Sequence, residues 1–120
     1  MQPELSEARE FLKERKLNNA RVVVNETLNM KLPNLVEIGI FGSLAKDSFT
    51  CKSDADIYLI FDGCIPDRET KGLLRSIAEE NDCDIAFVEE SHLASENPSP
   101  LVAEILNHRI ILWRSGGCCK

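Results

Sequence analysis

Two short stretches of the sequence carry residue types that suit phosphate and metal chemistry. Gly42-Ser43 follows an apolar run, and after ten further residues Asp54-Ala55-Asp56 opens the next one. Aspartate is depleted in β-strands, and like charges on one face of a strand repel each other. The two aspartates therefore indicate a compensating charge from outside the chain, and a divalent cation is the obvious candidate. The alternative is that Ser53-Asp54 is ordinary turn sequence before a strand.

A third carboxylate, Asp84, begins the apolar run DIAFV further along the chain. If Asp54 and Asp56 are both extended, their side chains leave the same face, and Asp84 lies beside them if the two strands pair. Three carboxylates would form an all-oxygen site, which suits Mg²⁺ or Mn²⁺ rather than zinc. Asp82 is a rival for the third position, but it precedes the strand. Such sites support two-metal phosphoryl and nucleotidyl transfer.

The Gly42-Ser43 pair fits the same chemistry. A glycine at the end of a strand lets the backbone approach a ligand closely, and the free amides at the start of a helix bind phosphate. Ser43 is also a suitable N-cap for a short helix over residues 44–48. A strand, a phosphate-binding turn and paired carboxylates together form a layout for holding a nucleoside triphosphate with its magnesium ion.

The hydrophobic pattern predicts the elements that would position these residues. Apolar residues at helical spacing indicate a helix over residues 4–17, a break at Asn18-Asn19 and a second helix from Ala20 to Leu28. A strand over residues 35–41 shows alternation at Val36, Ile38 and Ile40. The other predicted elements are strands 56–61, 84–88 and 110–113, a helix opened by Pro66-Asp67 with Leu73, Leu74, Ile77 and Ala78 on one side, and a helix opened by Ser99-Pro100 and running through Leu106.

Composition places the chain among soluble proteins of one domain. It has 120 residues, of which 43% are hydrophobic and 28% charged, and no apolar run approaches the roughly 18 residues of a membrane span. The charged N-terminus does not resemble a signal peptide, so we expect a cytoplasmic protein without a membrane partner. The net charge of −6 argues against generic binding of nucleic acid through its phosphates.

The five cysteines show no metal-binding spacing. Cys64 and Cys83 stand among apolar residues, which predicts reduced thiols in or near the core. We interpret Cys118-Cys119 as an incidental part of the tail.

The order Gly42-Ser43, ten residues, Asp54-Ala55-Asp56, with an apolar strand on each side, resembles the signature of the minimal nucleotidyltransferases of the DNA polymerase β-like superfamily. The resemblance covers roughly residues 20–113 and includes the third aspartate at the start of a strand. It implies an α/β (α+β) fold with a small mixed sheet of three to four strands flanked by helices. Residues 1–120 would form a single nucleotidyltransferase domain, with an extra N-terminal helix in residues 1–19 and a flexible tail over residues 114–120.

Carried over to this sequence, the resemblance implies a role for each residue of the motif. Asp54 and Asp56 would hold Mg²⁺ or Mn²⁺, and Asp84 would be the third carboxylate, a metal ligand that also serves as base on the acceptor hydroxyl. The residues that would bind ATP are Gly42, Ser43, Lys46 and Ser53.

The sequence departs from the family pattern Gly-Ser-Arg-Ala-Arg-Gly after the serine. Leu44 and Lys46 replace the two arginines, and Asp47 replaces the glycine. Lys46 can reach a phosphate as a point charge but lacks the bidentate geometry of arginine.

The resemblance implies transfer of a nucleoside monophosphate, AMP from ATP, to an acceptor hydroxyl with release of pyrophosphate. Because the sequence shows no separate acceptor-binding domain, we expect a partner protein or a homodimer to complete the cleft. Many minimal nucleotidyltransferases are antitoxins of all-helical HEPN ribonuclease toxins, so a HEPN-type toxin is the expected partner. Two alternatives remain: a non-catalytic module that neutralises its partner by contact, and an enzyme that modifies a small molecule such as an aminoglycoside.

Overall fold

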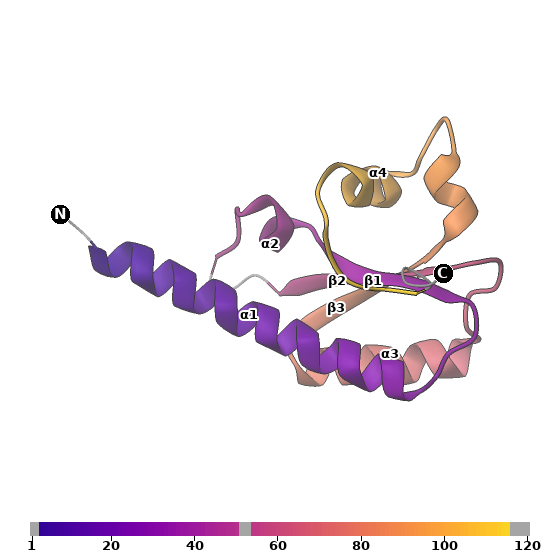
Figure 1. Cartoon of the computed structure of the whole chain (residues 1–120), viewed down its shortest axis with the longest axis horizontal. Coiled ribbons are helices and arrows are strands. Elements are labelled where there is room, and N and C mark those ends of the chain that lie inside the picture. The colour runs from indigo at the N-terminus through magenta and orange to yellow at the C-terminus, as the bar shows by residue number, and fades with distance from the viewer. Residues whose placement is uncertain (1–2, 51–53, 116–120) are drawn as a thin grey trace.

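A four-stranded mixed β-sheet organises the chain, as the computed structural model shows for residues 3–50 and 54–115, with side chains from residue 7 onward (Figure 1). The strand order is β3-β2-β1-β4. Strand β1 runs antiparallel to β2 and β4, whereas β2 and β3 are parallel. The predicted mixed sheet is confirmed. The strands are β1 (Leu35–Phe41), β2 (Ala55–Phe61), β3 (Cys83–Glu89) and β4 (Ile110–Arg114).

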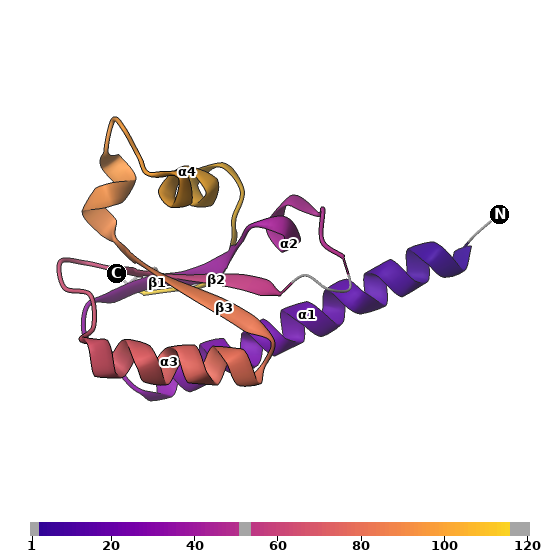
Figure 2. The same ribbon diagram turned by 180° about the vertical axis from the view of Figure 1, so that it is seen from behind.

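Helices cover both faces of this sheet. Helices α1 and α3 lie against one face, η1 and α4 lie over the other, and the short α2 follows directly from the end of β1 (Figures 1 and 2). Helix α2 therefore lies on the same side of the sheet as α4, at the end of the sheet where β1 stops. The helices are α1 (Pro3–Asn29), α2 (Ser43–Lys46), α3 (Arg68–Glu80), the 3₁₀-helix η1 (Glu90–Ala94) and α4 (Pro100–Asn107).

The alternation of side chains along the strands separates two apolar clusters. On the side of α1 and α3, Ile57 and Leu59 of β2 pack with Val23 and Leu74. On the side of α4, Tyr58 and Ile60 pack with residues of β3 and α4, namely Val88, Val102 and Ile105. Successive strand residues point to opposite faces. Strand β2 is therefore buried on both faces, which explains its nearly continuous apolar run.

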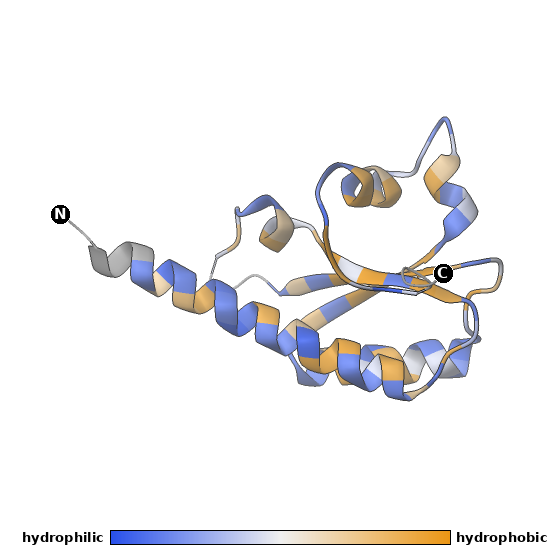
Figure 3. Cartoon of the chain, in the orientation of Figure 1, coloured by the Kyte–Doolittle hydropathy of each residue, from blue (hydrophilic) through white to orange (hydrophobic). Residues whose placement is uncertain are grey.

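The predicted break at Asn18-Asn19 is wrong, because α1 runs without interruption from Pro3 to Asn29. Asparagine costs a helix only a few tenths of a kcal/mol relative to alanine. Here the Asn18 side chain also accepts a hydrogen bond from Arg21 Nη1 at 2.8 Å, and the residues beyond it pack on the sheet. The first half of α1 projects past the sheet (Figure 3), and Phe11 there is 71% exposed.

Although α1 has 27 residues, no helix in the described ranges is both long enough and apolar enough to cross a membrane.

A β-bulge in β1 corrects the predicted alternation of Val36, Ile38 and Ile40. The register shifts between Leu35 and Glu37, so Val36 packs with the cluster under α4 while Ile38 and Ile40 pack with the cluster under α1. A bulge places two residues of one strand opposite one residue of its neighbour. Glu37 lies on the α4 side by regular alternation with Gly39 and Phe41, and its carboxylate there accepts a hydrogen bond from Tyr58.

Four smaller expectations also need correction. Leu73 is exposed, and only Leu74 and Ala78 of α3 are buried. Cys64 is exposed, whereas Cys83 is buried as expected. The short helix α2 ends at Lys46 rather than at residue 48. Arg114 belongs to β4 rather than to the tail, and Cys51 and Cys118-Cys119 lie outside the described residues.

Candidate active site

The register of the two parallel strands places the predicted carboxylates together. Asp56 of β2 is the direct partner of Asp84 of β3. Residues in register on parallel strands point to the same face, and Tyr58 and Val88, which follow at even spacing, identify that face as the α4 side. Asp54 is exposed immediately before β2. The expected pairing of the two strands is thus confirmed, and it brings Asp84 rather than Asp82 opposite Asp56.

The electrostatics of Asp56 reflect this crowding. Burial, as the largest cause, and the negative charges of Asp84, Asp54 and Glu104 together raise its pKa from the ordinary 3.8 to about 6. Within the described ranges, no cationic side chain forms an ion pair with the three aspartates. The sheet end therefore presents a concentration of negative charge that no cationic side chain of residues 7–50 and 54–115 neutralises through an ion pair.

The neighbouring Cys83 thiol responds to the same field. Burial, as the largest cause, and the negative charges of Asp54, Asp82, Asp56 and Asp84 together raise the pKa of Cys83 to about 12. Its Sγ donates a hydrogen bond to the backbone oxygen of Asn81 at 3.3 Å. A thiol that stays protonated is a poor nucleophile, so Cys83 is a structural residue beside the site.

Gly42 forms the turn between β1 and α2 and lies against Asp56. Its φ of 77° and ψ of −150° fall in a region that favours glycine. Asp56 pairs with Phe41, the residue before Gly42. A Cβ atom at position 42 would therefore overlap Oδ2 of Asp56. The positive φ favours glycine here, and any side chain would force the Asp56 carboxylate to move. Gly42, and not Ser43, is the N-cap of α2, and no side chain caps the helix; Ser43 is its first residue.

Lys46 is engaged within the protein. Its Nζ lies 2.5 Å from Oε2 of Glu104 in α4. Glu104 is a residue of this site that the sequence analysis missed, and its charge acts on Asp56. No spacing signal could have identified it, because it lies 48 positions after Asp56 on a different helix.

The remaining motif residues lie at the edge of the site or outside the described ranges. Asp47 adopts the left-handed conformation (φ 64°) at the C-cap of α2, a conformation that aspartate tolerates. Its Oδ1 lies 3.7 Å from Lys13 Nζ and 3.8 Å from Arg9 Nη2, so α1 supplies the opposing charge. Leu44 is buried in the core and cannot reach a ligand. Ser53 lies outside the described residues.

The donor atoms fit a hard divalent cation in kind. Asp54, Asp56 and Asp84 supply carboxylate oxygens only, the donor set of Mg²⁺ and Mn²⁺, and the raised pKa of Asp56 reports a position where a positive charge would be favourable. As the side chains stand, no group of three or more such donors in the described part of the chain is close enough together to hold a metal ion. The acidic residues are thus grouped along the strands but not arranged as a finished coordination cage.

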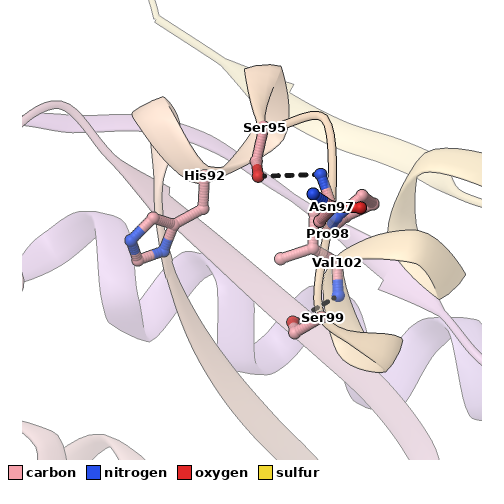
Figure 4. Close-up of a pocket in the computed structure, with 6 residues that line it drawn as sticks. All are labelled: His92, Ser95, Asn97, Pro98, Ser99 and Val102. Carbon is pink, nitrogen blue, oxygen red and sulfur yellow. Dashed lines mark hydrogen bonds between the residues drawn. The ribbon is translucent and has the colours of Figure 1, made fainter.

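A separate pocket of about 220 Å³ lies between η1 and the start of α4 (Figure 4). Ser95 Oγ accepts a hydrogen bond from the Asn97 amide, and Ser99 Oγ accepts one from the Val102 amide. The exposed His92 borders this pocket. None of the predicted site residues lines it, so it is distinct from the acidic sheet end.

The sequence model of a family described as "Polymerase beta, Nucleotidyltransferase" matches residues 22–115. The chain therefore belongs to this nucleotidyltransferase family, as the sequence signature predicted. Residues 3–21, the larger part of α1, lie outside the match. No curated protein matches the sequence.

Solved structures show the same fold. A Sulfolobus solfataricus protein assigned as a nucleotidyltransferase superposes with a TM-score of 0.60 at 23% identity, over 89% of this chain and 87% of that one. A toxin–antitoxin structure with AMP-PNP gives a TM-score of 0.55 at 23% identity, over 79% and 73% of the two chains. A complex of tri-AMPylated Shewanella oneidensis HEPN toxin with MNT antitoxin gives 0.53 at 20% identity, over 86% and 75%.

Proposed function

We propose that the protein is a Mg²⁺-dependent nucleotidyltransferase that transfers AMP from ATP to a hydroxyl group of a partner protein. The observation that carries this proposal is the facing pair Asp56 and Asp84, with Asp54 beside it and the Gly42 turn packed against Asp56. A cluster of repelling carboxylates has no use in a scaffold. It has a use where a cation and a polyphosphate must be held together.

The reaction joins the acceptor oxygen to the α-phosphorus of ATP. The bond between the α-phosphorus and the bridging oxygen of the β-phosphate breaks, pyrophosphate leaves, and a carboxylate accepts the hydroxyl proton. We assign that proton to Asp84, which is exposed at the start of β3. When bound, Mg²⁺ (or Mn²⁺) would neutralise the triphosphate and lower the pKa of the attacking hydroxyl. Asp54 and Asp56 would hold it, and the turn at Gly42-Ser43 would orient the phosphates.

The acceptor that we propose is a HEPN-type toxin, with this protein as its cytoplasmic antitoxin. A complex of a tri-AMPylated HEPN toxin with an MNT antitoxin and a toxin–antitoxin structure with AMP-PNP both contain a chain with the fold of this one. That likeness supports the proposal.

Titration calorimetry of ATP and of GTP into the pure protein, with and without Mg²⁺, tests the site. We expect binding that requires the metal, a preference for ATP, and loss of binding in Asp54→Asn/Asp56→Asn. Glu79→Gln/Glu80→Gln, two changes on the exposed end of α3, is the matched control for the loss of two charges and should bind normally. A folded wild-type protein that binds no nucleotide would contradict the catalytic proposal.

The second candidate function is neutralisation of the partner by contact alone. Two observations favour it: Leu44 is buried where the family pattern has an arginine, and Lys46 is paired with Glu104. The two functions differ in a toxin-neutralisation assay. A contact-only antitoxin keeps its effect in Asp54→Asn/Asp56→Asn, whereas an AMP-transferring antitoxin loses it together with the added mass on the toxin.

A further inference from the structure

The ion pair between Lys46 and Glu104 joins two elements that frame the acidic sheet end. Lys46 ends α2, which starts at the Gly42 turn, and Glu104 lies on α4. The atoms Nζ and Oε2 are 2.5 Å apart, and the two side chains are 39% and 34% exposed. An ion pair with this exposure contributes little to stability. Stabilisation of the folded state therefore does not explain why Lys46 and Glu104 are paired.

The surroundings of the pair are strongly negative. Glu104 acts on Asp56 together with Asp54 and Asp84, so four carboxylates share this region. Among the ion pairs of the described residues, the one between Lys46 and Glu104 is the only one that connects a cationic side chain to any of these four carboxylates. Its ammonium group is therefore the natural contact for an anionic ligand that enters between α2 and α4, and Glu104 occupies it.

A carboxylate and a phosphate offer lysine the same kind of contact. Both present oxygen acceptors with negative charge, and the ammonium group binds either as a point charge without demanding a planar partner. We propose that Glu104 takes the place of a phosphate on Lys46 in the nucleotide-free protein, so that ATP binds by displacing it. This inference rests on the proposed function and identifies Glu104 as the residue that sets the nucleotide affinity of the site.

The displacement has a consequence that separates it from a general effect of charge. Removing the Glu104 carboxylate frees Lys46 only if Lys46 is present. A purely electrostatic effect of one negative charge fewer would act on the nucleotide in either background. The dependence of one substitution on the other therefore measures the displacement.

The test is a double-mutant cycle read by calorimetry with ATP and Mg²⁺ on the full chain. It uses the wild type, Glu104→Gln, Lys46→Ala and the double variant. We expect Glu104→Gln to tighten binding by about threefold to fivefold, the range that corresponds to an exposed ion pair. Lys46→Ala should weaken binding, and adding Glu104→Gln to it should change the affinity by less than about twofold on the same scale. Thermal melts verify that all four proteins are folded.

Each other outcome overturns the inference. Equal tightening in both backgrounds would mean a general charge effect, and weaker binding by Glu104→Gln would mean that Glu104 helps to hold the nucleotide. Either result leaves the proposed function standing, because nucleotide still binds. Absence of binding in all four folded proteins would overturn the proposed function and the displacement with it.

Discussion

Acidic side chains occupy two places on the α4 face of the sheet, Glu37 at one and the pair Asp56 and Asp84 at the other, and they differ in whether cationic partners surround them. Glu37 of β1 is 4% exposed, and its carboxylate accepts hydrogen bonds from Tyr58 Oη at 2.5 Å, Arg109 Nη1 at 3.2 Å and Arg114 Nη2 at 2.9 Å. Asp56 of β2 faces Asp84, and within the described ranges neither forms an ion pair with a cation. The same functional group is neutralised internally at one place and left crowded at the other.

The difference separates a carboxylate that is tied into the fold from carboxylates that we propose to act on a ligand. A buried charge is tolerated when it is paired and hydrogen-bonded, and Glu37 uses its partners to tie β1 to β2 and β4. Gly39 makes this possible, because a Cβ atom there would overlap the hydroxyl of Tyr58. Burial and the Glu37 hydrogen bond raise the pKa of Tyr58, which keeps its hydroxyl as a donor. Among the described residues, Asp56 and Asp84 form no such ion pair, and this contrast supports the proposal that they act on a ligand.

The largest expected effect on stability comes from disrupting the hydrogen bonds and ion pairs of Glu37. Glu37→Gln removes the negative charge that Arg109 and Arg114 share. It also replaces one carboxylate oxygen by an NH2 group, which cannot accept the hydrogen bonds that Tyr58 and the arginines donate. We expect a loss of about 3 kcal/mol in the free energy of unfolding, typical of a buried charged group that loses its pairing. Urea denaturation measures it. The exposed Glu79→Gln should change stability by less than about 0.5 kcal/mol, and a similar small effect in Glu37→Gln would refute the structural role.

Gly42→Ala tests how closely the turn approaches the crowded group. The substitution strains a positive φ and pushes a methyl group onto Asp56, so we expect a loss of about 2 kcal/mol in stability and at least tenfold weaker binding of ATP with Mg²⁺. Gly63→Ala is the matched control, because its φ is also positive but nothing lies within 4 Å of its Cβ position. Equal effects of the two substitutions would show that contact with Asp56 is unimportant.

Asp56→Asn should act in the opposite direction to Glu37→Gln and stabilise the metal-free protein. The folded-state pKa of Asp56, about 6, lies above its ordinary 3.8, so the native state holds the proton more tightly and loses stability as the pH rises between these values. The shift sets an upper limit of about 3 kcal/mol, which solvent screening of a half-exposed group reduces to about 1 kcal/mol.

The advantage of Asp56→Asn should therefore be full above pH 7 and absent below pH 4. Denaturation curves of both proteins across this range measure it. Addition of Mg²⁺ should then raise the melting temperature of the wild type more than that of the variant. A stabilisation that is independent of pH would show that the charge of Asp56 is not its cause.

The smallest expected effect concerns Arg9, which links the first half of α1 to the loop before the aspartates. Its guanidinium stacks on Phe49 at 4.3 Å from the ring centre and donates hydrogen bonds to the backbone oxygens of Asp47 and Phe49. Arg9→Ala should cost about 1 kcal/mol and weaken nucleotide binding severalfold by loosening this loop. Arg9→Lys should restore part of both, and the exposed Arg15→Ala should change neither.

Local patterns account for most of what could be predicted. Alternation and apolar runs identified all four strands, and Ser99-Pro100 and Asp67 marked the starts of α4 and α3. The spacing of Gly42, Asp54 and Asp56 identified the family because these residues stand within fifteen positions of one another. The patterns failed where a distant contact changed a local preference. Asn18 stays helical because residues after it, such as Val23, pack on the sheet, and the bulge in β1 moves Val36 to the α4 face, away from Ile38 and Ile40.

The sequence by itself determined the elements, their order and the acidic motif, since each depends on neighbours within a few turns or along one strand. Only the tertiary structure decided which charges meet. Glu37 finds Arg109 and Arg114 across the sheet, Lys46 finds Glu104 on α4, and Asp47 finds Arg9 and Lys13 on α1. Ion pairs have no required spacing along a chain, because strand register and helix placement bring their partners together. A carboxylate is therefore held by hydrogen bonds and ion pairs at position 37, whereas the one at position 56 has no ion-pair partner among the described residues.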